Sequence, residues 1–569
     1  MDRITKSYVT EFRDKFHFES NIQQDVLFEH FVNYTLLEKK IDESLNDESI
    51  EKMNIGKNGT IGIDGFVILL NGHLITNTED LNLILDNNKK SIAEVIFIQS
   101  KTSTSFENKD IGLLGNAVSD FISEVQNYKW TENAIEKIDL FNTLISRVSD
   151  LIENPICSLY YVCLGNYNSE DANLNASKMK ILSDINSQKI FSKTSFTYVD
   201  YLGLQTEYKK IGQNITKSFD FALKTLIPDI ENVKEAYIGV VPVTTIIDLI
   251  KDDNSDLITT IFYDNVRDFQ GENKINDEIK KTLLDEKLRY AFSVLNNGVT
   301  IVAEKLTPSR NTFTISNYQI INGLQTSHIL FNNQQYIDDK VYVPLKLIIT
   351  QDENLISKII RSTNRQTAVK DEDLIAYSDF QKSLENFYKT FPENNKLHYE
   401  RRSKQYNNTK IDRNLIVDKS TQIKVIGSMF FNKPNIATRF FGALFKEFGN
   451  ELFLDTHKML PYYTPAFTYY QLEELFRMNF IDRKYKKLRY FILMMIRLEI
   501  SISNCPSFES KKSEDYCNAI LEKVNNLEEF KSIVTEVISK IDQLNLNLTD
   551  NELSKSSKLV EDLKKIYYK

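Results

Sequence analysis

The chain has 569 residues, of which 41% are hydrophobic and 26% charged, a composition that suits a globular protein of about two to four folded units. A formal net charge of −9 argues against a protein coated in nucleic acid, although local basic stretches stay compatible with it. Four scattered cysteines and six histidines match no zinc pattern and no disulfide framework. No apolar run reaches membrane-spanning length and the start lacks a signal-peptide pattern, so we expect a cytoplasmic protein without membrane contact.

The first predicted elements alternate between helix and strand. Residues 20–40 carry apolar side chains at helical spacing, and residues 59–75 form two strands around an Asn71-Gly72 hairpin signal. Residues 93–101 form a third strand, after which come a long helical pattern and two further buried strands. This order predicts an α/β domain over residues 1–205.

The remaining chain predicts a mixed α/β (α+β) domain over residues 206–454 and a helical region over residues 455–569. Two alternating strands lie in residues 296–322 around a Thr-Pro-Ser-Arg-Asn turn, and another strand leads into a helix that starts near residue 353. We expect the C-terminal helical region to cap the other domains or to form an oligomer, with a homodimer as the expected state.

The strand at residues 93–101 begins apolar and ends in a polar triplet. Alternation puts Gln99 and Lys101 on one face of the strand. If the preceding strand pairs with it, Asp64 arrives at the same corner of the sheet. A carboxylate and an amide oxygen are ligands that Mg²⁺ accepts, and an ammonium group there can hold the attacking water and offset charge in a transition state.

These residues resemble the PD-(D/E)XK nuclease superfamily. Asp64 corresponds to the first acid, Gln99-Ser100-Lys101 to the acid-X-Lys element in its glutamine variant, and Glu29 to the carboxylate that many members carry on the preceding helix. The resemblance implies a nuclease with Mg²⁺ or Mn²⁺ as cofactor, with Glu29, Asp64 and Gln99 as metal ligands and all four residues catalytic. The same spacing also occurs in α/β sheets without catalytic function, and Glu29 taken alone is typical of a solvated helix face.

Asn-Gly strings mark the middle of the chain. In residues 319–330 an apolar strand meets Asn322-Gly323 and then a helix, whose first N–H groups would attract an anion such as phosphate. The alternative is a tight strand-to-helix turn with Asn322 or Thr326 as the N-cap.

Four such strings together resemble the abortive-infection phage-resistance family, abbreviated AIPR. They are Asn265 to Phe269, Asn296 to Thr300, Ile321 to Thr326 and Ser362 to Gln366, within a similarity that extends over residues 235–440. A weaker similarity links them to ParB-like nucleotide-binding modules. We therefore assign nucleic-acid or nucleotide binding to the polar members Arg267, Asn297, Asn322, Gln325, Thr326, Asn364, Arg365 and Gln366.

A basic stretch follows these strings. Residues 396–440 contain ten Lys or Arg against three Asp or Glu, with Tyr399, Tyr406 and Phe440 interleaved. Basic groups neutralise phosphates and aromatic rings stack on bases, so Arg401, Arg402 and Lys404 join the predicted nucleic-acid surface. Solvated helices and loops have similar charge counts.

The sequence thus predicts an anti-phage defence effector, in which a metal-dependent nuclease cleaves DNA or RNA and an AIPR-type domain binds nucleic acid or a phage-derived trigger. One alternative is a catalytically inactive nuclease fold that acts as a sensor or nucleotide-binding module through the AIPR-type domain. Another is a modification-dependent restriction enzyme.

Overall fold

The structure, a computed structural model, has a mixed α/β fold, as the sequence predicts. The residues that it describes are 1–19, 21–55, 62–87, 90–212, 215–252, 257–262, 274–364, 379–402, 404–406, 409, 411–438, 441–548, 550 and 552–568. The chain divides into two compact units, which are treated separately below. The first comprises Met1–Phe12 and Ile22–Leu374, and the second comprises Arg13–Asn21 and Ile375–Lys569.

A five-stranded sheet of order β2-β1-β3-β4-β5 organises the N-terminal part of the first unit. Its strands are β1 (Gly65–Leu70), β2 (His73–Ile75), β3 (Ala93–Lys101), β4 (Ile156–Cys163) and β5 (Lys193–Val199). The β1–β2 hairpin turns at Asn71 and Gly72, whose φ angles of 52° and 88° fit the left-handed turn that this dipeptide favours. Strand β3 is antiparallel to β1 and parallel to β4, which in turn is parallel to β5.

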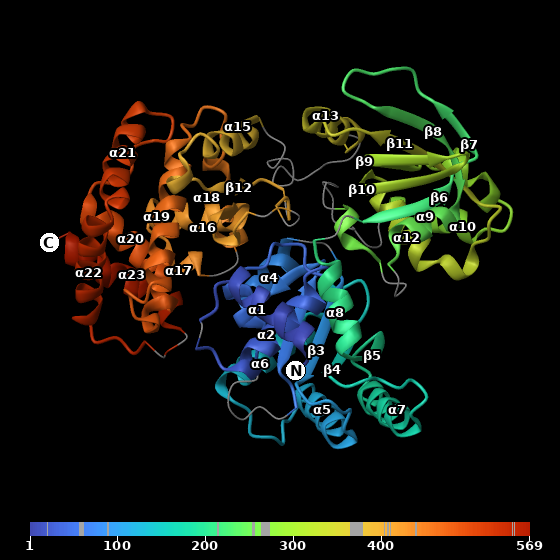
Figure 1. The fold of residues 1–569 in the computed structure, drawn as a ribbon, viewed down its shortest axis with the longest axis horizontal. Helices are drawn as coiled ribbons and strands as arrows, with labels where there is room; N and C mark the ends of the chain where they lie inside the picture. The colour runs from blue at the N-terminus through green and yellow to red at the C-terminus, as the bar shows by residue number, and fades with distance from the viewer. Residues whose placement is uncertain are drawn as a thin grey trace. The chain divides into compact units, whose positions relative to one another are not determined.

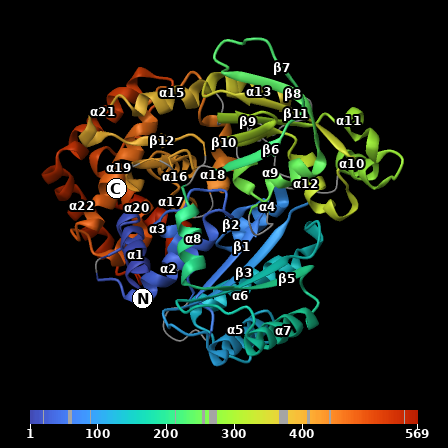
Figure 2. The ribbon, with the colours of Figure 1, turned by 45° about the vertical axis from the view of Figure 1, so that its right-hand side comes forward.

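Helices cover both faces of this sheet. They are α1 (Arg3–Lys15), α2 (Gln24–Leu37), α3 (Asp47–Met53), α4 (Thr78–Asn87), α5 (Asn108–Phe121), α6 (Glu132–Ser146), α7 (Ala172–Ser187) and α8 (Tyr201–Lys210). Figure 2 shows α5 and α7 on one side of the sheet and α2 and α8 on the other. Aromatic contacts of Phe121 with Phe66 and Phe97, at centroid distances of 4.9 and 5.3 Å, fix α5 on its face.

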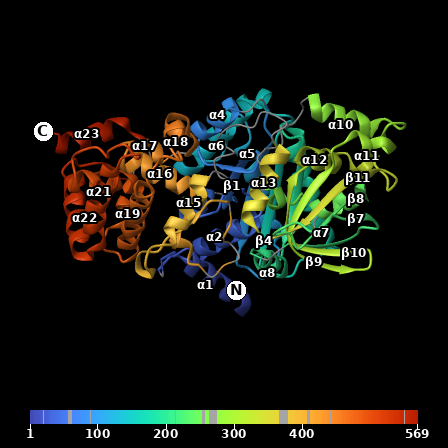
Figure 3. The same cartoon turned by 90° about the horizontal axis from the view of Figure 1, so that it is seen from above.

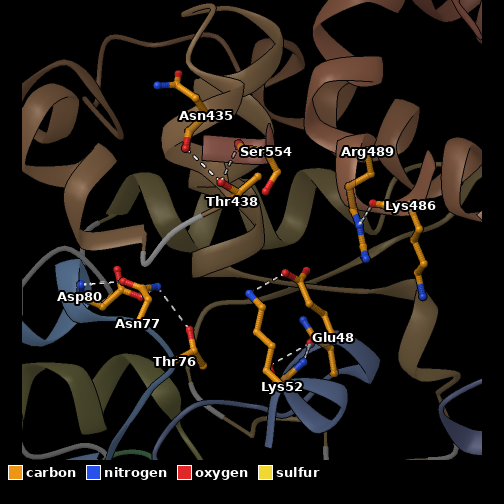
Figure 4. Close-up of polar contacts among 12 residues, drawn as sticks. Glu48, Lys52, Thr76, Asn77, Asp80, Asn435, Thr438, Lys486, Arg489 and Ser554 are labelled. Atoms are coloured by element: carbon orange, nitrogen blue, oxygen red, sulfur yellow. Dashed lines mark hydrogen bonds and ion pairs between the residues drawn. The ribbon is translucent and has the colours of Figure 1, made fainter. Parts of the chain in front are cut away.

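Local polar contacts support these helices. The side chain of Asn77 accepts a hydrogen bond from the Asp80 backbone N–H (2.9 Å) at the start of α4, and its amide donates to the Asp80 carboxylate (2.6 Å). Along α3, Lys52 pairs with Glu48 at 2.8 Å, one turn earlier. Both pairs are drawn in Figure 4. They are ordinary capping and i,i+4 contacts and assign no function to these residues.

A six-stranded sheet of order β6-β10-β9-β11-β8-β7 forms the rest of the first unit. Its strands are β6 (Thr216–Asp220), β7 (Leu223–Leu226), β8 (Glu235–Pro242), β9 (Val299–Ser309), β10 (Thr312–Asn322) and β11 (Tyr342–Ile349). Its α-helices are α9 (Val243–Ile250), α10 (Lys274–Leu284), α11 (Phe292–Leu295), α12 (Leu324–Asn332) and α13 (Glu353–Asn364). Figure 1 shows α9, α10 and α12 together beside this sheet, where they bury its main core.

The second unit is mainly helical. Its helices are α15 (Asp379–Tyr388), α16 (Lys419–Met429), α17 (Pro434–Ala437), α18 (Phe441–Phe448), α19 (Leu460–Arg477), α20 (Arg489–Ile500), α21 (Lys511–Asn525), α22 (Leu527–Asp542) and α23 (Ser557–Tyr567), and its short strands β12 (His398–Glu400) and β13 (Ile416–Asp418) are parallel. In Figure 3, α19, α21 and α22 lie side by side. Thr438 bridges Asn435 O and Ser554 O at 3.0 and 3.1 Å (Figure 4).

The unit boundary differs from the predicted one. The sequence places a boundary between residues 454 and 455, whereas one continuous hydrophobic core joins Phe380 on α15 to Leu563 on α23. Helix α16 packs against both α19 and α20 within that core. The described residues between 379 and 454 therefore fold with the C-terminal helices, because their apolar side chains share that core. Among the described residues, no helix is both long enough and apolar enough to cross a membrane.

Candidate active site

The end of the β1–β3 ladder gathers three of the predicted site residues. Gly65 on β1 lies opposite Ile98 on β3, so the adjoining Asp64 and Gln99 lie at the same end of the strand pair. The Asp64 backbone N–H donates to Ile98 O at 2.9 Å, which fixes this approach. Lys101 ends β3 two residues later. The antiparallel register thus brings Asp64 to the polar end of β3, as the sequence predicts.

Ser100 holds the carboxylate of Asp64. Its backbone N–H donates to Asp64 Oδ2 at 2.7 Å, and its hydroxyl lies 3.4 Å from the same oxygen. Burial raises the pKa of Asp64 above its ordinary value, while the Ser100 hydrogen bonds and the Lys101 charge act in the opposite direction. The sequence gives Ser100 no role, because a middle residue in an acid-X-Lys pattern carries no signal for a backbone contact to a distant carboxylate.

Glu29 reaches the same corner from α2. Burial, followed by the nearby charge of Asp64, raises the pKa of Glu29 from an ordinary 4.5 to about 7, whereas the Lys101 charge acts in the opposite direction. Asn54, which follows α3, donates to Glu29 Oε2 at 2.6 Å and opposes the rise. Glu29, Asp64 and Lys101 are therefore electrostatic neighbours, and Asn54 is a supporting residue that sequence reasoning misses.

Gln99 supplies an unused acceptor. Its side chain is 2% exposed, and Oε1 has no hydrogen-bond partner among the residues that the structure describes. The Asn33 amide on α2, 1% exposed, is likewise unpartnered within the described part of the chain and lies against Gly65. Leaving such a group unpartnered costs about 1–3 kcal/mol. A bound ion or a water molecule can complete the coordination of such an acceptor.

Glu29, Asp64 and Gln99 carry oxygen atoms of the kind that could hold a divalent cation. Within the described residues, no group of three or more His, Cys, Asp or Glu side chains could hold a metal ion. An ion at this corner would therefore rest on the carboxylates of Glu29 and Asp64, the Gln99 amide oxygen and water. Such an oxygen-only set with few protein ligands fits Mg²⁺ or Mn²⁺ and does not fit zinc.

The second set of predicted residues is only partly described. Arg267, Arg365, Gln366 and the side chain of Asn364 lie outside the described residues. Asn297 is exposed, and Asn322 ends β10 opposite Thr300 on β9.

Two Asn-Gly turns interlock at this end of β9 and β10. Gly298 and Gly323 have φ angles of 77° and 106°, and a Cβ at Gly298 would lie 2.2 Å from the Pro344 carbonyl oxygen. Asn296 Oδ1 accepts from the Gly298 N–H at 2.8 Å and from the Thr326 hydroxyl at 3.4 Å. The motif glycines therefore have a structural cause, because only glycine combines these φ angles with such close contacts.

Helix α12 begins directly after this turn. The tight strand-to-helix turn of the alternative is therefore present, but its N-cap is Gly323, no side chain caps the helix, and the assignment of Asn322 or Thr326 as the N-cap is wrong. The Thr326 hydroxyl turns to Asn296 instead, and Gln325 Oε1 accepts from the Asn276 amide at 2.7 Å. The first turn of α12 is thus surrounded by Asn and Gln side chains, yet its N–H groups lack a side-chain cap.

Part of the basic stretch is structural. Arg401 is 3% exposed and pairs with Glu385 on α15 at 3.3 Å, so its guanidinium does not reach solvent. Tyr399 is fully buried and donates to Gln381 Oε1 at 2.5 Å. Arg402, Lys404 and Tyr406 are half-buried, and Phe440 lies outside the described residues. Arg401 and Tyr399 are therefore part of the core of the second unit, and Arg402 and Lys404 remain candidates for contact with nucleic acid.

The fold is mixed α/β, with the carboxylates of Glu29 and Asp64 near the polar end of β3, followed by a region that contains two Asn-Gly turns and a helical core. The family model described as AIPR protein matches residues 262–568, more than half of the chain. The chain belongs to the AIPR family, whose name, abortive infection phage resistance, indicates anti-phage defence. No curated protein and no solved structure matches the chain. Glu29, Asp64, Gln99 and Lys101 all lie outside the matched residues, so their chemistry has to be argued from the geometry.

Proposed function

We propose that the chain is a cytoplasmic defence effector that hydrolyses phosphodiester bonds with Mg²⁺ or Mn²⁺ at the corner formed by Glu29, Asp64, Gln99 and Lys101. The observation that supports this most is that the pKa values of Glu29 and Asp64 are both raised beside Lys101, on a strand end that also carries Gln99 with its unpartnered amide oxygen. Such groupings of perturbed carboxylates are typical of catalytic sites.

Each residue has a separate role in this proposal. Glu29, Asp64 and Gln99 would hold the ion, and Ser100 and Asn54 keep the two carboxylates in place through hydrogen bonds of 2.7 and 2.6 Å. The chemistry that Mg²⁺ supplies when bound is polarisation of the phosphate and acidification of a water molecule. Lys101 orients the attacking water and offsets the negative charge that develops on the phosphoryl oxygens.

The test is cleavage of labelled DNA and RNA by the purified full chain in the presence of Mg²⁺, Mn²⁺ or EDTA. We expect products that EDTA suppresses, and we expect Asp64→Ala and Lys101→Ala each to reduce the rate by at least about a hundredfold. Glu51→Ala, at an exposed position on α3, is the matched control and should cleave normally. Cleavage that persists in both site variants would remove the assignment. Loss of protection against phage in the same variants would connect the chemistry with defence.

A second candidate function is binding of a nucleotide or phosphate at the start of α12. It is favoured by the uncapped helix start at Gly323 and by the amide side chains of Asn322 and Gln325 near it. In that case the N-terminal site would be inactive and the chain would act as a sensor. Nucleotide binding that is lost in Asn322→Ala, in a protein that cleaves neither DNA nor RNA, would support this second candidate.

A further inference from the structure

The loop that follows Lys101 presents a row of hydroxyl groups to solvent. Residues 102–105 have the sequence Thr-Ser-Thr-Ser, and all four are exposed. The Ser103 hydroxyl turns inward and donates to Ser105 O at 3.2 Å. The hydroxyls of Thr102 and Thr104 make no hydrogen bond within the part of the chain that the structure describes. The hydroxyls of Thr102 and Thr104, one and three residues after the candidate catalytic lysine, are therefore available to a ligand.

Strand β4 fixes the backbone of this loop. Cys163 lies opposite Lys101 in the parallel β3–β4 register, and it is fully buried. Its thiol lies 3.1 Å from each of two possible acceptors, Ser103 O and Ser105 O. Its sulfur accepts a hydrogen bond from the Gly165 N–H at 3.4 Å. A Cβ at Gly165 would lie 2.4 Å from Thr104 O, so glycine is needed for the two loops to meet. The hydroxyls of the loop are thus carried on a backbone that is held in place before any ligand binds.

The loop lies at the carboxyl ends of the parallel strands, where α/β sheets bind ligands. Strands β3, β4 and β5 are parallel, and Lys101 and Cys163 are the last residues of β3 and β4. In α/β sheets, ligands bind outside the carboxyl ends of parallel strands. Thr102 and Thr104 follow Lys101 by one and three residues, which is a reach of roughly 3–10 Å along the chain. A phosphodiester held at Lys101 would therefore have its neighbouring phosphates near the loop.

We propose that residues 102–105 bind the sugar–phosphate backbone of the nucleic-acid substrate next to the scissile phosphate, through the hydroxyls of Thr102 and Thr104. This inference rests on the proposed function of the Glu29–Asp64–Lys101 corner. Cys163 is a positioning residue that holds the loop and does not touch the substrate. Hydrogen bonds from hydroxyl groups to phosphate do not depend on the bases, so we expect this contact to accept a nucleic-acid backbone of any sequence.

The experiment compares Thr102→Val/Thr104→Val with the wild type in the full chain. Valine keeps the shape of threonine and replaces the hydroxyl with a methyl group, which cannot form a hydrogen bond. We expect KM for a labelled oligonucleotide to rise about tenfold, with kcat within about twofold, because hydrogen bonds to a charged phosphate are lost. Thr225→Val on β7 removes an exposed hydroxyl elsewhere and is the matched control, with unchanged KM.

Cys163 is tested by Cys163→Ser and Cys163→Val. Serine keeps a donor for the Ser103 and Ser105 carbonyls, so we expect it to retain a KM near that of the wild type, whereas valine raises KM and leaves kcat largely unchanged. Thermal unfolding of all variants identifies any that fail to fold. Equal KM values for the serine and valine variants, both folded, would refute the positioning role.

Failure of the loop and failure of the nuclease chemistry give different results. If wild type cleaves the oligonucleotide and KM is unchanged in Thr102→Val/Thr104→Val, the binding role of the loop is refuted and the proposed nuclease chemistry is not affected. If wild type cleaves neither nucleic acid, fluorescence anisotropy of the same labelled oligonucleotide on the wild-type chain decides. An affinity for the oligonucleotide that falls about tenfold in Thr102→Val/Thr104→Val supports the binding role of the loop without the nuclease chemistry. No binding by either protein, or equal affinities, refutes the binding role of the loop.

Discussion

Replacement of Glu29 by glutamine is expected to stabilise the fold above neutral pH while it removes activity. The pKa of Glu29 is about 7 in the folded chain against an ordinary value of 4.5. Folding therefore takes up a proton between these values, and the free energy of unfolding falls as pH rises through about 7. The difference between the two pKa values corresponds to about 3 kcal/mol of destabilisation when Glu29 is ionised. Because Glu29 is partly exposed, screening by water reduces this expected destabilisation to about 1–2 kcal/mol.

Chemical denaturation at about pH 6 and about pH 8 measures this effect. In wild type we expect ionisation of Glu29 to lower the free energy of unfolding by about 1 kcal/mol between the lower and the higher pH. Glu29→Gln has no group that ionises at this position, so we expect this contribution to be absent in the variant. The glutamine still offers an oxygen to Asn54, so the hydrogen bond at 2.6 Å has an acceptor in both proteins. At about pH 8 the variant should be about 1–2 kcal/mol more stable than wild type. Glu51→Gln, at an exposed position on α3, is the matched control.

Mg²⁺ adds a second readout to the same measurement. An ion that binds between Glu29 and Asp64 stabilises the folded chain by mass action, and it does so more at about pH 8, where Glu29 is ionised. We expect wild type to gain stability with Mg²⁺ and Glu29→Gln to gain clearly less. Identical pH dependence in wild type and Glu29→Gln, or a variant that is less stable at about pH 8, would contradict the electrostatic description of the site.

Two further predictions concern the AIPR part of the chain. Arg401→Met should cost about 1–3 kcal/mol of stability in urea denaturation, because the buried Glu385 loses its arginine while it keeps Lys389 and the Gln405 amide, each at 2.9 Å. We expect Lys404→Ala, and not Arg401→Met, to weaken nucleic-acid binding. Unaltered stability would show that the pair is unimportant. Gly298→Ala should cost more than about 2 kcal/mol, because a Cβ there would lie 2.2 Å from Pro344 O at a φ of 77°, whereas Gly112→Ala on α5, where a Cβ meets nothing within 4 Å, should stabilise the fold by about 0.5–1 kcal/mol. Equal unfolding midpoints for the two alanine variants would rule out this explanation of the family's Asn-Gly strings.

Short-range features of the fold could be predicted from the sequence. The Asn71-Gly72 hairpin follows from a dipeptide that favours positive φ angles at both positions. The polar end of β3 follows from alternation over nine residues, and it placed Asp64 at the correct corner once β1 paired with β3. Such features depend on neighbours in the chain or on a single strand pairing, which is why pattern reading finds them.

Features that depend on distant packing could not be predicted. Arg401 counts as one more positive charge in a basic stretch, and only the folded chain shows that Glu385, 16 residues earlier, takes up that charge in the core. The boundary predicted near residue 455 fails to anticipate the shared core for the same reason, because the helical pattern does not say which apolar faces meet. Asn54 and Ser100 support the site through single hydrogen bonds that leave no periodicity or motif in the sequence.

The neutral residue at position 99 follows from the electrostatics of its surroundings. Burial already raises the pKa values of both Asp64 and Glu29, and the negative charge of Asp64 raises the pKa of Glu29 further by repulsion. A third carboxylate at a side chain only 2% exposed would raise these values further, so that the cluster would hold protons at neutral pH in place of an ion. Glutamine keeps the oxygen at the strand end without that charge. In the proposed site, Glu29 and Asp64 would carry the negative charge and Gln99 would contribute only its oxygen, so a glutamine at this position would be matched to the carboxylate on α2.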